Sequence, residues 1–103
     1  MRERRYTIEF LRSAERELEG LPRAAQRAVT EAIARLAIQP RPDAAKLLSG
    51  TGRERIWRLH VGEYRVLYLI EDNRLVVVVV RVADRREAYR QTDMKRLLKR
   101  LAR

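Results

Sequence analysis

One histidine and two arginines lie close together in the sequence, separated by apolar residues and by the pair Gly62-Glu63: they are Arg58, His60 and Arg65. Imidazole has the ordinary pKa that suits proton transfer near neutral pH. Guanidinium groups stay protonated and bind phosphate oxygens through a planar set of donors. These residue types together predict a site that binds a phosphate group and moves a proton beside it.

The pair Gly62-Glu63 predicts how these side chains meet. Glycine in the first position of a two-residue loop is typical of a type II′ β-hairpin. If this pair is the loop, His60 lies directly opposite Arg65, and Arg58 points to the same side. Directly opposed residues share a face, with Cβ atoms about 5 Å apart. The other face would then carry the apolar residues of both strands, an agreement that supports this register: Trp57, Leu59, Val61, Tyr64, Val66 and Tyr68.

Other basic and aromatic residues flank the predicted hairpin. Arg85 and Tyr89 follow the last predicted strand, in a segment of the kind that often supplies catalytic groups, although the register does not settle whether they reach the same face. Further contacts with a polyanion are expected from basic residues in loops and at strand ends: Lys46, Arg53, Arg55 and Arg86. The alternative for all of these cations is a solvated surface, and for His60 it is a satisfied polar contact.

The overall charge points to an anionic partner. The chain has 24 Lys and Arg against 14 Asp and Glu, a net charge of +10, which favours binding to a polyanion by counterion release. An acidic protein partner would use the same field, and an arginine-rich surface without a partner is the remaining alternative. The chain has no cysteine, which excludes a disulfide framework, a thiolate zinc site and a cysteine nucleophile.

The length of 103 residues suits a single domain spanning residues 1–103, and the 46% hydrophobic content is that of a globular protein. The longest apolar run, residues 75–80, is far shorter than the roughly 20 residues of a membrane-spanning helix. The N-terminal residues do not form the pattern of a signal peptide. We therefore expect a cytoplasmic protein.

A strand and two helices are predicted before the hairpin. Residues 6–10 alternate apolar and polar side chains, as a half-buried strand does. Ser13 is predicted to cap a first helix that Gly20 ends, and Pro22 to occupy the first turn of a second helix. The prolines within residues 39–42 end this second helix. Several alanines lie among the residues on the apolar sides of the two helices: Ala14, Leu18, Leu21, Ala25, Val29, Ala32, Ile33 and Leu36.

Residues 43–52 are predicted as a loop, after which the apolar spacing changes to the period of two that strands show. Three strands follow, separated by turns at residues 62–63 and 72–73: residues 54–61, 64–70 and 75–82. Five consecutive valines predict that the last of them is a central strand covered on both faces. Residues 93–101 are predicted as a short final helix. The pattern indicates an α+β fold in which a helical hairpin packs on a sheet.

Three segments of the sequence together resemble the RelE/ParE toxin superfamily. They are Lys46-Leu47-Leu48-Ser49-Gly50, the hairpin whose second strand reads Tyr64-Arg65-Val66-Leu67-Tyr68, and the valine-rich strand that continues into Asp84, Arg85 and Tyr89. The family has a lysine, a leucine and a glycine before an arginine-containing strand, then a tight turn and a Tyr-Arg-Val-x-Tyr strand. It ends in a valine-rich strand followed by His-Arg-x-x-x-Tyr. The resemblance covers nearly the whole chain.

The resemblance implies a four-stranded antiparallel sheet packed against a helical hairpin. RelE-like members of the superfamily are ribosome-dependent endoribonucleases that need no metal, whereas ParE-like members inhibit DNA gyrase. Both kinds are encoded with an antitoxin that neutralises them. For this chain the resemblance therefore implies a toxin that cleaves messenger RNA on the ribosome, beside the 16S rRNA, with no metal and no cofactor. It also implies a cognate antitoxin, with DNA gyrase as the alternative partner.

On motif position, the resemblance implies five catalytic residues: Arg58, His60, Arg65, Arg85 and Tyr89. We expect His60 to act as the base, because neighbouring arginines favour its neutral form. We expect Arg65 and Arg85 to stabilise the phosphorane, with assistance from Arg58. Tyr89 would stack on a base or transfer a proton. Asp84 stands where many relatives have histidine, which leaves open a catalytically weakened relative that acts in an autoregulatory complex.

Overall fold

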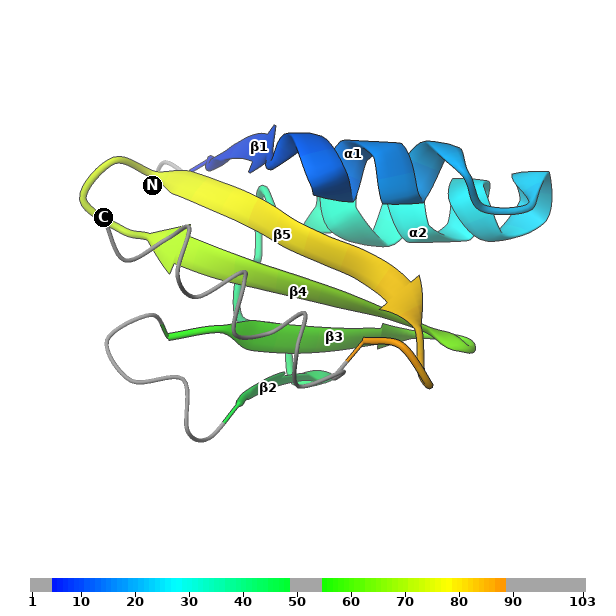
Figure 1. The fold of residues 1–103 in the computed structure, drawn as a ribbon. Coiled ribbons are helices and arrows are strands. Elements are labelled where there is room, and N and C mark those ends of the chain that lie inside the picture. The colour runs from blue at the N-terminus through cyan, green and yellow to red at the C-terminus, as the bar shows by residue number, and fades with distance from the viewer. Residues whose placement is uncertain (1–4, 49–54, 89–103) are drawn as a thin grey trace.

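The computed structural model describes residues 5–48 and 55–88 of the chain. Two helices pack on one face of a five-stranded sheet (Figure 1). The elements in chain order are β1 (Thr7–Phe10), α1 (Arg12–Glu19), α2 (Arg23–Arg35), β2 (Ala45–Leu47), β3 (Trp57–Val61), β4 (Tyr64–Glu71) and β5 (Val76–Asp84). The α+β fold class is confirmed, and the helix predicted at residues 93–101 lies outside the described residues.

The sheet has the strand order β1-β5-β4-β3-β2 and differs in two ways from the expected four antiparallel strands. First, three residues of the segment predicted as a loop form β2, which pairs antiparallel with β3. A strand of three residues is too short to show the period of two. Second, β1 pairs with β5 in parallel. These two strands are joined by no turn, so nothing local in the sequence specifies their direction.

The first face of the sheet packs against both helices. The core between them contains apolar side chains of both helices and the inward side chains of β3, β4 and β5: Ala14, Val29, Ala32, Ile33, Leu36, Leu59, Val66, Tyr68, Val77, Val79 and Val82. Alanines on the helices allow the helix axes to approach the sheet closely. On the second face, Ile56, Leu67 and Val80 are buried as a smaller apolar cluster. The valine-rich β5 is therefore central, as predicted, between β1 and β4.

The helix ends are only partly those that the sequence predicts. Gly20 ends α1, with its N–H donated to the carbonyl of Arg16 at 3.0 Å. Pro22 directly precedes α2, where its missing N–H costs no hydrogen bond. The prediction that Ser13 caps α1 is wrong, because the helix already begins at Arg12 and has no side-chain cap.

Helix α1 also covers an edge that β1 is too short to cover. β1 pairs with residues 76–79 of β5, and beyond them the N–H of Val82 donates to Glu17 Oε1 at 2.8 Å. A carboxylate on the helix thus satisfies a donor of a strand edge that would otherwise be open.

The described residues contain no helix long and apolar enough to cross a membrane.

The strand ends shift by one to three residues from their predicted positions. The predicted strand 54–61 begins only at Trp57, and the predicted strand 75–82 runs instead from Val76 to Asp84. Leu75 belongs to the turn before β5 and has a positive φ of 53°. That conformation is rarely adopted by a branched residue, and the sequence gives no sign of it.

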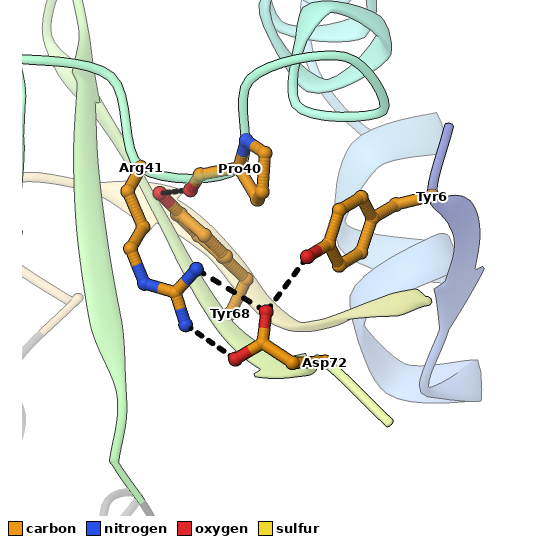
Figure 2. A network of polar contacts seen from close by, with 5 residues as sticks. All are labelled: Tyr6, Pro40, Arg41, Tyr68 and Asp72. Carbon is orange, nitrogen blue, oxygen red and sulfur yellow. Dashed lines mark hydrogen bonds and ion pairs between the residues drawn. The ribbon is translucent and has the colours of Figure 1, made fainter. Parts of the chain in front are cut away.

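Hydrogen bonds from two tyrosines connect distant segments of the chain at the end of the sheet opposite the Gly62-Glu63 turn. The hydroxyl of Tyr68 donates to the carbonyl of Pro40 at 2.8 Å, and the hydroxyl of Tyr6 donates to Asp72 Oδ1 at 2.7 Å (Figure 2). Burial raises the pKa of Tyr68 to about 12, and the hydrogen bond to Asp72 raises that of Tyr6. Both hydroxyls therefore remain donors through the neutral range.

Arg41 completes this cluster and fixes the connection that leads into β2. Its Nη2 lies 2.7 Å from Asp72 Oδ2, and its guanidinium carbon lies 5.6 Å from the centre of the Trp57 ring. The hydrogen bond to Asp72 raises the pKa of Arg41. The α2–β2 connection is thus attached to the β4–β5 turn through Asp72 (Figure 2) and to β3 through Trp57.

Replacing Tyr68 by phenylalanine tests this attachment. Tyr68→Phe removes the hydroxyl that donates to the Pro40 carbonyl, and we expect the free energy of unfolding to fall by about 1–2 kcal/mol. Urea denaturation followed by circular dichroism measures the change. Tyr64→Phe removes the same atom from a half-buried tyrosine of the same strand and is the control. Equal losses in the two variants would contradict the role of the bond.

Candidate functional site

The hairpin of β3 and β4 has the register that the sequence predicts. His60 pairs with Arg65, Leu59 with Val66, and Arg58 with Leu67. Gly62 has a φ of 58° in the first position of the turn, a conformation that favours glycine. Leu59 and Val66 belong to the core under the helices. Because side chains alternate along a strand, Arg58, His60 and Arg65 share the second face.

His60 lies in an environment that favours its neutral form. Partial burial of the ring lowers the pKa of His60, and the positive charges of Arg65 and then Arg58 lower it further. The side chain is nevertheless exposed, so a proton donor from a ligand can reach it. An accessible imidazole that is neutral at pH 7 is suited to act as a base.

The guanidinium of Arg65 is held against the turn by backbone carbonyls. Its Nη1 donates to the carbonyl of Gly62 at 3.1 Å and to that of Tyr64 at 3.0 Å. Among the described residues no carboxylate forms an ion pair with Arg65, so its charge is not neutralised by them. A fixed, uncompensated guanidinium is what stabilisation of an anion requires.

The structure brings Arg85 to the same turn but pairs it with a carboxylate. The backbone N–H of Arg85 donates to the carbonyl of Glu63 at 2.9 Å, and its Nε lies 3.2 Å from Glu63 Oε1. Both side chains are mostly exposed, at 60% and 72%. This contact places Arg85 beside the turn that joins β3 and β4. Glu63, which the sequence predicts only as a turn residue, is the partner of a predicted catalytic cation.

Lys46 lies in β2 directly opposite Arg58. The sequence predicts a catalytic role for Arg58 and a binding role for Lys46, but not their pairing, because residues 43–52 were predicted as a loop. Arg58 is part-buried, and its Nε is buried without a hydrogen-bond acceptor among the described residues. Lys46 is exposed.

The remaining predicted site residues are spread more widely. Arg55 is exposed just before β3, and Arg86 is exposed in the turn after β5. Arg53 and Tyr89 lie outside the described residues. Asp84, the departure from the family pattern, accepts the N–H groups of Arg86 and Glu87 at 2.9 and 3.0 Å on its Oδ1. Its carboxylate therefore organises the turn that follows β5.

Arg81 is a part-buried cation that the sequence pattern did not single out. The register of β4 and β5 shifts between Leu67 and Tyr68, so that Arg81 lies opposite Leu67 within the valine-rich strand. Its side chain is 14% exposed, with Nη1 at 3.6 Å from Glu17 Oε2 and Nη2 donating to the carbonyl of Glu87 at 2.9 Å. These contacts join α1 to the turn after β5, which is a structural role.

Comparison with known proteins gives consistent matches. The model of the family "ParE toxin of type II toxin-antitoxin system" matches residues 8–89. The Toxin RelG of Mycobacterium tuberculosis is 37% identical over 90 residues, which are 84% of this chain and 98% of RelG. The RelBE2 toxin–antitoxin complex of M. tuberculosis contains a chain that is 34% identical, with a TM-score of 0.69, covering 79% of this chain and 99% of that one.

The archaeal RelE–RelB complex from Pyrococcus horikoshii OT3 contains a similar chain as well. It is 27% identical, with a TM-score of 0.69, and the match covers 81% of this chain and 98% of that one. In all three comparisons with relatives, nearly the whole of the relative is matched.

The titration of His60 tests the electrostatics of this face. We expect the midpoint, followed by NMR of the imidazole protons, to lie below the ordinary value of about 6.5. Arg65→Gln removes one of the charges that lower it, so the midpoint should move upward. Arg74→Gln removes a charge from the turn at the other end of β4 and should leave it unchanged. A midpoint that stays the same in Arg65→Gln would show that the charge of Arg65 does not lower the pKa of His60.

Proposed function

This chain belongs to the RelE/ParE superfamily of type II toxin–antitoxin toxins, and from that premise we propose that it is an endoribonuclease that cleaves messenger RNA on the ribosome. The observation that supports the proposal is the hairpin face with a neutral-favouring His60 directly opposite Arg65. A base for the 2′-hydroxyl and a fixed cation for the phosphorane are two of the three groups that metal-independent RNA cleavage uses, and the third is an acid for the leaving 5′-oxygen.

The proposed reaction uses the ribose as its nucleophile. Neutral His60 takes the proton of the 2′-hydroxyl, the 2′-oxygen forms a bond to phosphorus, and the bond to the 5′-oxygen breaks. The products are a 2′,3′-cyclic phosphate and a 5′-hydroxyl, which receives a proton from a general acid. Arg65 stabilises the additional negative charge of the phosphorane. Arg85 adds to this stabilisation once its side chain leaves Glu63. Tyr89 is the candidate for the general acid or for stacking on a base.

The ribosome enters the proposal because the cationic cluster lies on an exposed strand face. Alignment of the 2′-oxygen, phosphorus and 5′-oxygen in one line requires that the message be held in a bent conformation. His60 is exposed and Arg65 is part-buried near the turn that joins β3 and β4, so this face alone offers few contacts to bend a flexible strand. A message held in the decoding site would arrive already oriented.

A cognate antitoxin completes the proposed function. Two of the similar chains are found in complexes named RelBE2 and RelE–RelB. The net charge of +10 favours a partner segment with acidic residues, laid over the basic face as a helix or an extended strand. Such a segment would cover the cluster and exclude RNA from it.

Inhibition of DNA gyrase is the second candidate, because the family model that matches residues 8–89 is that of ParE toxins. A gyrase inhibitor acts by binding and needs no base or fixed cation at the hairpin. Cells that express the chain distinguish the two functions. Cuts in messages at codon positions support the nuclease, whereas DNA breaks trapped on gyrase support the inhibitor.

Single-turnover cleavage on ribosomes programmed with a defined message tests the nuclease directly. We expect Arg65→Ala to slow cleavage by about 10²–10³-fold, the usual cost of losing one oxyanion donor. His60→Ala should cost about 10²–10⁴-fold through loss of the base. Arg74→Ala, at the far turn, is the control and should retain the parent rate. Full cleavage rates in both site variants would show that the assignment is wrong.

Glu63→Gln tests whether Arg85 participates. The substitution removes the carboxylate that pairs with Arg85. We expect the toxin concentration that half-saturates programmed ribosomes to fall by about 1.5–5-fold, which corresponds to the strength of an exposed ion pair. Glu71→Gln removes a carboxylate that pairs with Arg74 at 3.0 Å in the other turn and changes the net charge equally. Equal effects of the two variants would mean that net charge alone is responsible.

A further inference from the structure

Lys46 and Arg58 form a directly opposed pair of like charges between β2 and β3. Like charges in directly opposed positions destabilise a sheet unless an anion lies between them. Among the described residues no carboxylate forms an ion pair with either side chain. Two opposed cations are unfavourable for the stability of the sheet, and unfavourable local arrangements of this kind are expected at functional sites.

The two side chains differ in how far they are fixed. Arg58 lies opposite Leu67, which is fully buried, and the Nε of Arg58 is itself buried without an acceptor among the described residues. Its guanidinium is therefore packed against the sheet. Lys46 is exposed, and its flexible stem can bring an ammonium group to an anion that the arginine already holds.

The position of this pair relative to His60 and Arg65 identifies the ligand. Arg58 and His60 are two residues apart on β3, about 6.6–6.8 Å along the strand, and their partners lie on opposite sides of β3, so the two pairs are also offset by one strand spacing of about 4.7–4.9 Å. Successive phosphates of an extended RNA strand have a comparable spacing. Two anion positions at this separation suit a polynucleotide better than a single phosphate ion.

We propose that Lys46 and Arg58 form a second phosphate-binding subsite, which takes the phosphate next to the one held by His60 and Arg65. The inference rests on the proposed function and deepens it, because it assigns Arg58 to binding of the neighbouring phosphate and not to the reacting one. The subsite determines which linkage of the message lies beside His60. Its loss therefore weakens binding while the rate of the bound complex stays the same.

A trinucleotide that cannot be cleaved tests the subsite without the ribosome. The probe carries 2′-O-methyl riboses and two linkages, and a second version has one linkage replaced by a neutral methylphosphonate. NMR titration of the full chain at low ionic strength measures both affinities. We expect the parent protein to bind the doubly charged probe several-fold more tightly. In Lys46→Gln this preference should shrink to less than about half of its parent value, since each phosphate contact contributes separately.

Arg27→Gln is the matched control. Arg27 is exposed on α2, so its substitution removes one positive charge away from the hairpin face and should leave the preference for the doubly charged probe intact. An undiminished preference in Lys46→Gln, or equal reductions in the two variants, overturns the subsite. So does a Lys46→Gln variant that loses affinity for an acidic peptide but none for the trinucleotide.

The same measurements separate this inference from the proposed function. If ribosome-bound messages stay uncut but the probe preference depends on Lys46, the nuclease function is wrong and the subsite stands. If messages are cut and the preference does not depend on Lys46, the subsite is wrong and the nuclease stands. Lys46 is exposed in a three-residue strand, and a melting temperature of Lys46→Gln that is no lower than that of the parent confirms that its fold is intact, because the substitution removes a like-charge repulsion.

Discussion

The two-residue turn at Gly62 is the constraint on which the rest of the site depends. Its positive φ of 58° fixes which residues of β3 and β4 are opposed. A slip of one residue would exchange the two faces, putting cations under the helices and apolar side chains in water. The cost of that exchange makes the register unique. The same turn also supplies the carbonyl of Gly62 that holds Arg65.

The packing of the sheet explains why cations can be arranged so close together. The first face is filled by the helices, and the second has its own buried centre at Leu67 and Val80. With apolar contacts supporting both sides, the strands stay in place despite repulsion at the hairpin end. The partial burial that lowers the pKa of His60 is a consequence of this arrangement. Stability and the electrostatic character of the face thus come from the same packed strands.

The sequence was sufficient where structure follows from neighbouring residues. The hairpin register could be counted from Gly62, and the central place of β5 followed from its valines. Contacts between distant segments could not be predicted in this way. The parallel pairing of β1, the three-residue β2 and the contact of Arg85 with Glu63 depend on how separate segments pack. The place of Lys46 opposite Arg58 was hidden for the same reason.

The central claim is that the hairpin face receives the scissile phosphate of an RNA. The most direct test is a structure by cryo-electron microscopy of the chain on a ribosome that carries a message with a 2′-O-methyl ribose at the cleavage position. The account predicts that the scissile phosphate lies between the imidazole of His60 and the guanidinium of Arg65. A message bound against the outer surface of α2, or a hairpin face that touches no RNA, would contradict it.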